Sequence, residues 1–266
     1  MGRVLCQTRP VPAVAVHHEV SGPVEAPVVV LAGSLGSTLA MWDPQVPALS
    51  EHLRVVRYDL RGHGRSPVPP GPYSMDDLVD DMVALLDRLE VERAHVVGLS
   101  LGGMAAIRMA VREPHRVDRL ALLCTSACLG PPQGWAERAA AVRTDGTASI
   151  AAAVVGRWLT AEQYQADPAL VAELEAMIAS TPVEGYAASC AAIEHMDQRG
   201  DLASILAPTL ALAGSDDPVT PPAHLAAIAT AIPGGRLLVL DGAAHLANLG
   251  QRTAVNEALI GHLVTY

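Results

Sequence analysis

The sequence predicts an α/β protein with a mainly parallel, doubly wound sheet and an inserted helical segment. Short apolar runs alternate with helical patterns over the first 125 residues and again from residue 207. The stretch 126–206 has helical periodicity and lacks a strand pattern. We therefore expect an α/β core formed by residues 1–125 and 207–266, and a helical cap formed by residues 126–206.

The expected strands are short and apolar, as is typical of parallel strands covered by helices on both faces. They are predicted at residues 11–20, 27–31, 54–58, 94–97, 119–124, 209–213 and 236–240. Helices are predicted in the core at 76–90, 104–111, 222–230 and 252–263, and in the cap at 134–143, 149–159, 168–180 and 183–196. Ligands of such sheets bind where the parallel strands end. The loops that follow the strands are therefore the places to look for chemistry.

Composition and charge narrow the class of protein. The 266 residues are 50% hydrophobic and 17% charged, which is typical of a compact globular chain. A net charge of −10 argues against binding to nucleic acid or to an anionic membrane. The sequence lacks a signal-peptide pattern and an apolar run long enough to span a membrane, and its four cysteines form no C-x-x-C pair. We expect a cytoplasmic protein with reduced thiols.

Ser100 lies in the most informative stretch of the chain. An apolar strand runs directly into Gly-Leu-Ser-Leu-Gly, and a helical pattern follows. Gly98 and Gly102 flank the serine because a Cβ at either position would collide with the neighbouring strand or helix. Such a turn raises the serine hydroxyl above the edge of the sheet. The pentapeptide alone is a weak signal, but strand before and helix after are the context that a nucleophile requires.

A serine nucleophile needs a histidine base and a carboxylate that orients it. His245 lies between the last predicted strand and the last helix, at the same edge of the sheet as Ser100. The carboxylate is expected in the loop after the strand at 209–213, where Asp216 and Asp217 both occur. The spacing from the strand end favours Asp217. The resulting chain order, Ser then Asp then His, is typical of one superfamily of serine hydrolases.

An acyl-transfer site also needs two N–H groups for the developing oxyanion. The N–H of Leu101 follows from the geometry of the serine turn. We expect the second donor in the loop after the strand at 27–31, and we assign it to Ser34, because Gly33 allows the chain to turn beneath it.

Five motifs together resemble the capped α/β-hydrolases along the whole chain. They are A-G-S-L-G at 32–36, D-L-R-G-H-G-R-S at 59–66, G-L-S-L-G-G at 98–103, G-S-D-D-P-V-T-P at 214–221 and G-A-A-H at 242–245. Within that superfamily the chain resembles the 3-oxoadipate enol-lactonases of the protocatechuate branch of the β-ketoadipate pathway. Four further segments carry this narrower resemblance: 31–45, G-W-A-E-R at 134–138, 185–197 and 243–251. One departure is Ala32, where most relatives have histidine.

This resemblance implies a reaction and a substrate. The enzyme would open a small lactone that carries a carboxylate, through a serine acyl-enzyme, without a metal or an organic cofactor. Trp135 and Arg138 lie three residues apart on one predicted helix face, and we take them as candidates for a pocket wall and a carboxylate partner. An equally good interpretation is a packing tryptophan and a solvated arginine. For Tyr186 we favour packing, and for the motif at 59–66 a turn network.

Other functions remain as alternatives. The first is a carboxylesterase or perhydrolase that acts on small uncharged esters. The second is a ligand receptor on the same fold that keeps its triad without turnover. A haloalkane dehalogenase is disfavoured because its chemistry needs aspartate where Ser100 stands, and hydride transfer because G-x-G-x-x-G does not follow the first strand.

Overall fold

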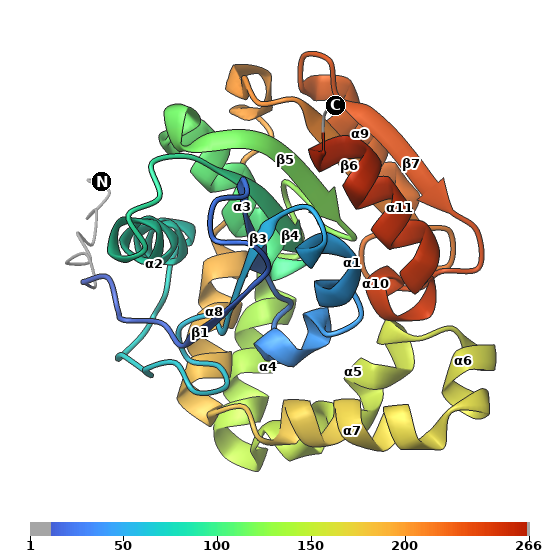
Figure 1. The fold of residues 1–266 in the computed structure, drawn as a ribbon. Coiled ribbons are helices and arrows are strands. Elements are labelled where there is room, and N and C mark those ends of the chain that lie inside the picture. Colours follow the sequence, from blue (N-terminus) through green and yellow to red (C-terminus); the bar gives the residue numbers. More distant parts are fainter. Residues whose placement is uncertain (1–11, 265–266) are drawn as a thin grey trace.

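The computed structural model describes residues 12–264 and contains a seven-stranded sheet between layers of helices (Figure 1). The strands are β1 (His18–Ser21), β2 (Val28–Ala32), β3 (Arg54–Tyr58), β4 (Ala94–Leu99), β5 (Val117–Leu123), β6 (Thr209–Gly214) and β7 (Arg236–Leu240). Their order across the sheet is β1-β3-β2-β4-β5-β6-β7. β1 pairs antiparallel with β3, and the remaining pairs are parallel. The predicted fold class is confirmed.

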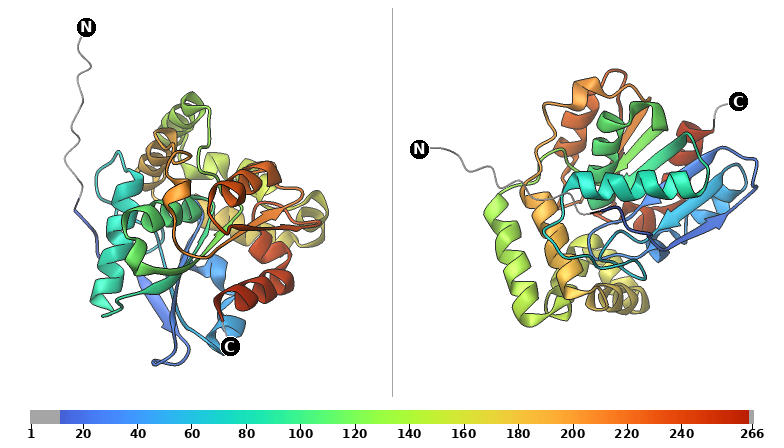
Figure 2. Two further views of the ribbon diagram at one scale, coloured as in Figure 1. Left: turned by 90° about the horizontal axis from the view of Figure 1, so that it is seen from above. Right: turned by 90° about the vertical axis from the view of Figure 1, so that its left-hand side faces the viewer.

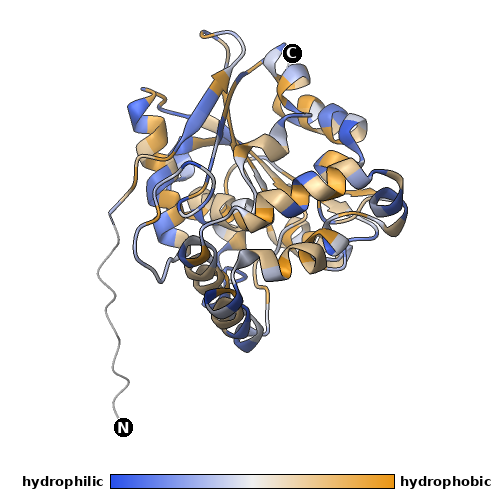
Figure 3. Cartoon of the chain, turned by 90° about the horizontal axis from the view of Figure 1, so that it is seen from below, coloured by the Kyte–Doolittle hydropathy of each residue, from blue (hydrophilic) through white to orange (hydrophobic). Residues whose placement is uncertain are grey.

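Helices cover both faces of the sheet, as the apolar strands require. The core helices are α1 (Val46–Ser50), α2 (Met75–Arg88), α3 (Leu101–Arg112), α9 (Pro222–Ala231), α10 (Ala247–Gly250) and α11 (Arg252–Leu263). Alternate residues of each strand face opposite layers. In β2, Val30 and Ala32 belong to the hydrophobic cluster that includes α2, α3 and α9, whereas Val29 and Leu31 belong to the cluster that includes α1 and α11. Figure 3 shows hydrophobic residues concentrated along the centre of the molecule.

A second group of helices separates β5 from β6 in the sequence. These inserted helices are α4 (Pro132–Asp145), α5 (Ala151–Trp158), α6 (Ala161–Ala166), α7 (Pro168–Ala179) and α8 (Val183–Glu194). They lie together at one end of the sheet, and α4 and α8 pack along each other (Figures 1 and 2). Four of them match predicted helices within about three residues, whereas α6, which a Thr160–Gln163 capping box begins, was not predicted.

The start of the chain differs from the prediction. The strand expected at 11–20 forms only from His18 to Ser21. Residue 11, where the predicted strand begins, lies outside the described residues. Between residues 12 and 264, no helix is sufficiently long and apolar to cross a membrane. Cys124, Cys128 and Cys190 are free thiols, and Cys6 lies outside the described residues.

A buried ion pair fixes the loop after β3 to α2. The side chain of Arg61 is fully buried, and its Nε and Nη2 donate to the two carboxylate oxygens of Asp81 at 2.6 and 2.7 Å. Asp81 also accepts the N–H of Val14 at 2.7 Å. Burial raises the pKa of Asp81, and the Arg61 charge acts against that rise. Because both charged groups are buried away from water, each offsets the desolvation cost of the other.

We expect Asp81→Ala to destabilise the fold by about 3–5 kcal/mol, because it leaves the buried Arg61 charge without its main carboxylate. The matched control is Asp80→Ala, one residue away, which removes a partly exposed ion pair to Arg112. That change should cost less than about 1 kcal/mol. Urea unfolding followed by circular dichroism measures both values, and equal losses would contradict this account.

Candidate active site

Ser100 occupies the turn between β4 and α3 in a strained backbone conformation, with φ 55° and ψ −117°. Positive φ is rare for residues other than glycine, and it persists only where the surroundings enforce it. A Cβ on Gly98 would collide with the backbone of Gly102, and one on Gly102 would collide with the carbonyl of Ala32. The structure therefore contains the close backbone contacts that we predicted at these two glycines.

Hydrogen bonds attach this turn to both neighbouring strands. The Gly102 N–H donates to the carbonyl of Gly33 at 2.9 Å, beyond the end of β2. The Thr125 hydroxyl, beyond the end of β5, donates to the Ser100 carbonyl at 2.7 Å. Because α3 begins at Leu101, the Leu101 N–H belongs to the first turn, whose donors lack partners within the helix. It is thus available to an anion beside Ser100.

His245 lies in the loop after β7 and contacts Asp217, which follows β6. Nδ1 of His245 is 2.8 Å from Oδ2 of Asp217, and both side chains are buried. Because a carboxylate only accepts hydrogen bonds, Nδ1 carries the hydrogen and Nε2 keeps its lone pair. Asp216 instead accepts a hydrogen bond from Ser215. The structure therefore places Asp217, the favoured one of the two predicted aspartates, against His245.

Asp217 is held in its ionised form. Its Oδ1 accepts the N–H groups of Val219 and Thr220, and its Oδ2 accepts the Thr220 hydroxyl at 2.8 Å. Burial acts to raise the pKa of this carboxyl, but the hydrogen bonds from His245 and Thr220 outweigh it and lower the pKa below its ordinary value. A carboxylate that stays charged keeps the imidazole oriented over the working pH range.

The segment 33–37, which we call the β2 loop, carries the predicted donor Ser34. In this structure the Ser34 N–H donates to Sδ of Met41 at 3.3 Å. A thioether sulfur is a weak acceptor, so an oxyanion would compete successfully for this donor. The Gly36 N–H donates to Nε2 of His63 at 2.9 Å, while Nδ1 of His63 lies 3.1 Å from the Arg61 carbonyl. A neutral histidine thus braces the loop, and burial lowers its pKa.

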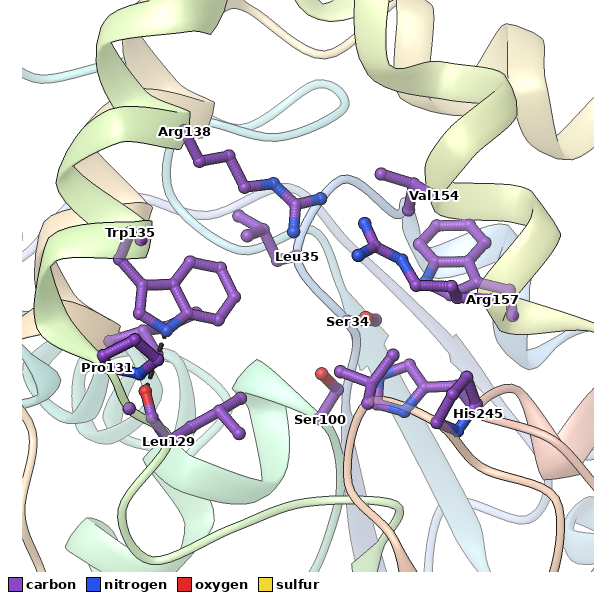
Figure 4. Close-up of a pocket in the computed structure, with 16 residues that line it drawn as sticks. Ser34, Leu35, Ser100, Leu129, Pro131, Trp135, Arg138, Val154, Arg157 and His245 are labelled. Atoms are coloured by element: carbon purple, nitrogen blue, oxygen red, sulfur yellow. Dashed lines mark hydrogen bonds between the residues drawn. The ribbon is translucent and has the colours of Figure 1, made fainter.

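A cavity of about 370 Å³ connects these groups to the inserted helices (Figure 4). Ser34, Ser100 and His245 lie at its floor. Its walls come mainly from the inserted helices and the segment before α4, and include Leu129, Trp135, Arg138, Val154, Arg157, Trp158 and Ile193. All the predicted site residues except Leu101 and Asp217 therefore line one cavity, and those two adjoin Ser100 and His245.

Two guanidinium groups project toward each other across this cavity (Figure 4). Arg138 from α4 contacts two aromatic rings, with its Cζ 5.4 Å from the ring centroids of both Trp135 and Tyr186. Arg157 comes from α5. Burial and the neighbouring charge of Arg138 lower the pKa of Arg157. Among the described residues neither guanidinium forms an ion pair with a carboxylate, so their charges can attract an anionic ligand.

Sequence reasoning missed Arg157 and the adjacent Trp158. The helix predicted at 149–159 contains a single charged residue, Arg157, among alanines, valines and glycine. That isolated cation next to a tryptophan is the signal that could have identified it. Clusters of three or more His, Cys, Asp or Glu side chains suited to a metal ion do not occur between residues 12 and 264.

Comparison with known proteins identifies the family. Residues 26–250 match the model of the alpha/beta hydrolase fold family. The chain is 36% identical to 3-oxoadipate enol-lactonase 2 of Acinetobacter baylyi over 246 residues, which cover 92% of each protein. It is 30% identical to the putative carbamate hydrolase RutD of Agrobacterium fabrum, over 93% of this chain and 98% of that protein.

Solved structures agree with this relationship. The crystal structure of the enol-lactonase from Burkholderia xenovorans LB400 is 39% identical and superimposes with a TM-score of 0.91, over 93% of this chain and 96% of that one. The chain therefore belongs to the alpha/beta hydrolase fold family and is a hydrolase of that family. Its resemblance to the enol-lactonases is confirmed.

The crowding around the serine turn leads to a testable prediction. Gly102→Ala should destabilise the fold by about 3 kcal/mol or more, because its Cβ would strike the Ala32 carbonyl. It should also lower ester hydrolysis about 100-fold by displacing Ser100. Gly156→Ala is the matched control, since its Cβ would meet nothing within 4 Å on helix α5. Thermal unfolding and p-nitrophenyl acetate hydrolysis test both, and a harmless Gly102→Ala would refute the steric argument.

Proposed function

We propose that this hydrolase opens 3-oxoadipate enol-lactone to 3-oxoadipate by serine catalysis, with Ser100, His245 and Asp217 as the triad and the inserted helices as a cap. One observation carries the proposal. The cavity above Ser100 and His245 holds two guanidinium groups that form no ion pair with a carboxylate of the described chain. The similarity to enol-lactonases supports the same substrate.

The geometry supports acylation of Ser100. Because Nδ1 of His245 is committed to Asp217, Nε2 is the atom that takes the proton when the Ser100 hydroxyl attacks the lactone carbonyl. The carbonyl oxygen becomes an oxyanion, which the N–H groups of Leu101 and Ser34 stabilise. For Ser34 this requires that its N–H exchange the weak bond to Met41 for a bond to the charged oxygen.

Collapse of that intermediate breaks the ring. The leaving oxygen departs as an enol, which is a better leaving group than an alkoxide, and protonated His245 supplies its proton. The enol then tautomerises to a ketone. Water that His245 deprotonates attacks the acyl-enzyme, and a second collapse frees Ser100 and releases the product with a new carboxylate.

The remote carboxylate of the substrate has a complementary site. Arg138 and Arg157 approach the cavity from different helices, and a guanidinium binds a carboxylate through two parallel hydrogen bonds. Burial and the neighbouring Arg138 charge together lower the pKa of Arg157, and an anion between the two arginines would relieve the repulsive part. Since the chain carries a net charge of −10, this local pair must overcome the overall field to attract an anionic lactone.

A second candidate is a carbamate hydrolase, which the 30% identity to RutD over 93% of the chain favours. The two arginines weigh against esterases or perhydrolases for uncharged esters, because such substrates would leave both charges uncompensated. The 36% identity to an enol-lactonase over 92% of the chain weighs against a receptor without turnover.

The deciding experiment compares two substrates. The protein should hydrolyse enzymatically generated 3-oxoadipate enol-lactone, followed by its loss of ultraviolet absorbance, with a kcat/KM at least about 100-fold above that for p-nitrophenyl acetate. Ser100→Ala should lower both activities by 10⁴-fold or more, on the order found for other serine triads, while the circular dichroism spectrum stays unchanged. Fast cleavage of p-nitrophenyl acetate without hydrolysis of the lactone would contradict the proposed substrate but not the proposed triad.

The arginine pair predicts how specificity responds to mutation. Arg138→Met and Arg157→Met should each raise the KM for the lactone about 10- to 100-fold, because each removes one charge-assisted hydrogen bond to the substrate. The KM for p-nitrophenyl acetate should stay within twofold. Arg143→Met is the matched control, because Arg143 also lies on α4 but pairs with Glu184. If Arg143→Met changed lactone binding as strongly, the assignment would be wrong.

A further inference from the structure

Tyr186 lies where α8 meets both α4 and the β2 loop. Its side chain is fully buried, and its hydroxyl makes no hydrogen bond of normal geometry among the described residues, although it interacts electrostatically with the nearby Arg138 guanidinium. A buried hydroxyl without such a hydrogen bond costs stability that phenylalanine would avoid. The contacts of the ring therefore explain what the residue does, and they extend in two directions.

One face of the Tyr186 ring meets Arg138. The guanidinium carbon lies 5.4 Å from the ring centroid and equally far from that of the Trp135 ring, so two aromatic side chains contact the cation. Trp135 is itself fixed, because its indole N–H donates to the Leu129 carbonyl at 2.8 Å. Cation–π contacts of this kind restrict the direction in which a guanidinium can point. The position of Arg138 in the cavity thus depends on Tyr186.

The edge of the same ring meets the β2 loop. A Cβ built on Gly36 would lie 3.0 Å from Cε2 of Tyr186, so the ring packs directly against this glycine. Gly36 has φ +82°, a conformation that excludes most other residues, and it lies two positions after Ser34. His63 accepts its N–H at 2.9 Å, and the Thr181 hydroxyl lies 3.4 Å from its carbonyl and 3.3 Å from the Met177 carbonyl. Tyr186 therefore packs against one side of a residue whose N–H is already held by His63.

We propose that Tyr186 is a positioning residue that couples the carboxylate site at Arg138 to the oxyanion donor at Ser34 through Gly36. The proposal rests on the proposed function and adds a role for a residue that touches neither the reacting atoms nor the cavity. A carboxylate bound at Arg138 fixes the guanidinium, the guanidinium fixes the ring, and the ring holds the β2 loop. Binding energy gained far from the lactone carbonyl is then used to align the N–H that stabilises the transition state.

The first test uses p-nitrophenyl acetate, which has no carboxylate for Arg138 and so reports on the β2 loop alone. Tyr186→Leu should lower kcat about 10- to 100-fold and leave KM within twofold. This loss of kcat is smaller than the loss expected when one oxyanion donor is removed completely. Tyr186→Phe keeps the ring and should retain kcat within twofold. Tyr186→Met fills more of the space and takes the place of Tyr186→Leu if the latter does not fold.

Tyr164→Leu is the matched control for this test. Tyr164 lies on α6 among the inserted helices, does not line the cavity and contacts Glu175 through its hydroxyl. The control should shift the melting temperature without lowering kcat. If Tyr186→Leu also lowered the melting temperature and kept kcat, Tyr186 would have a purely structural role and the proposal would be overturned.

The second test measures the coupling with an anionic ester, mono-p-nitrophenyl succinate, in a double-mutant cycle of Tyr186→Leu and Arg138→Met. If the ring acts through Arg138, the double variant should lose at least about threefold less kcat/KM than the product of the two single losses. Multiplicative losses, or an Arg138→Met variant without effect on this ester, would overturn the coupling. A wild-type protein that cleaves both aryl esters but leaves the enol-lactone intact would refute the proposed function, and both Tyr186 tests would still be decisive.

Discussion

The close approach of two backbone segments is the constraint on which the rest of the site depends. β2 and β4 are parallel neighbours, and their registered ends bring the β2 loop against the serine turn. At that point Gly102 passes so near the Ala32 carbonyl that a side chain is excluded. The Gly102 N–H donates to Gly33, so the Ser100 turn and the β2 loop share one hydrogen-bonded frame. His245 and Asp217 then need only follow β7 and β6 to meet Ser100 at the same edge of the sheet.

The division of chemistry between core and inserted helices follows from this frame. The core supplies the floor of the cavity, because Ser34 and Ser100 follow the buried strands β2 and β4. Asp217 follows the buried strand β6, and His245 lies in the loop after β7, the exposed strand at the edge of the sheet. The inserted helices supply the cationic wall through Arg138 and Arg157, and their placement does not alter the sheet. Substitutions in the inserted helices can therefore change the cavity wall without displacing Ser100, and one fold can carry sites for many different functions.

Much of this arrangement could be predicted from the sequence, because its signals are local. Strand-length apolar runs, the glycines around Ser100 and the loops after the last two strands each depend on a few adjacent residues. Contacts between distant segments could not be predicted in the same way. The meeting of Arg157 with Arg138, the bond from Ser34 to Met41 and the contact of Tyr186 with Gly36 all depend on how the inserted helices and the β2 loop pack. Periodicity places a residue on a face of a helix, but it does not say what that face meets.

The two arginines that share the cavity also link stability to small anions. Two like charges held close together destabilise the folded chain, and any carboxylate that settles between them relieves that repulsion. A solute that binds only the folded state raises the free energy of unfolding in proportion to the logarithm of its concentration, once that exceeds the dissociation constant. We therefore expect acetate, succinate and citrate to bind weakly between the two guanidinium groups and to raise the free energy of unfolding. Each should also compete with an anionic ligand for this cavity.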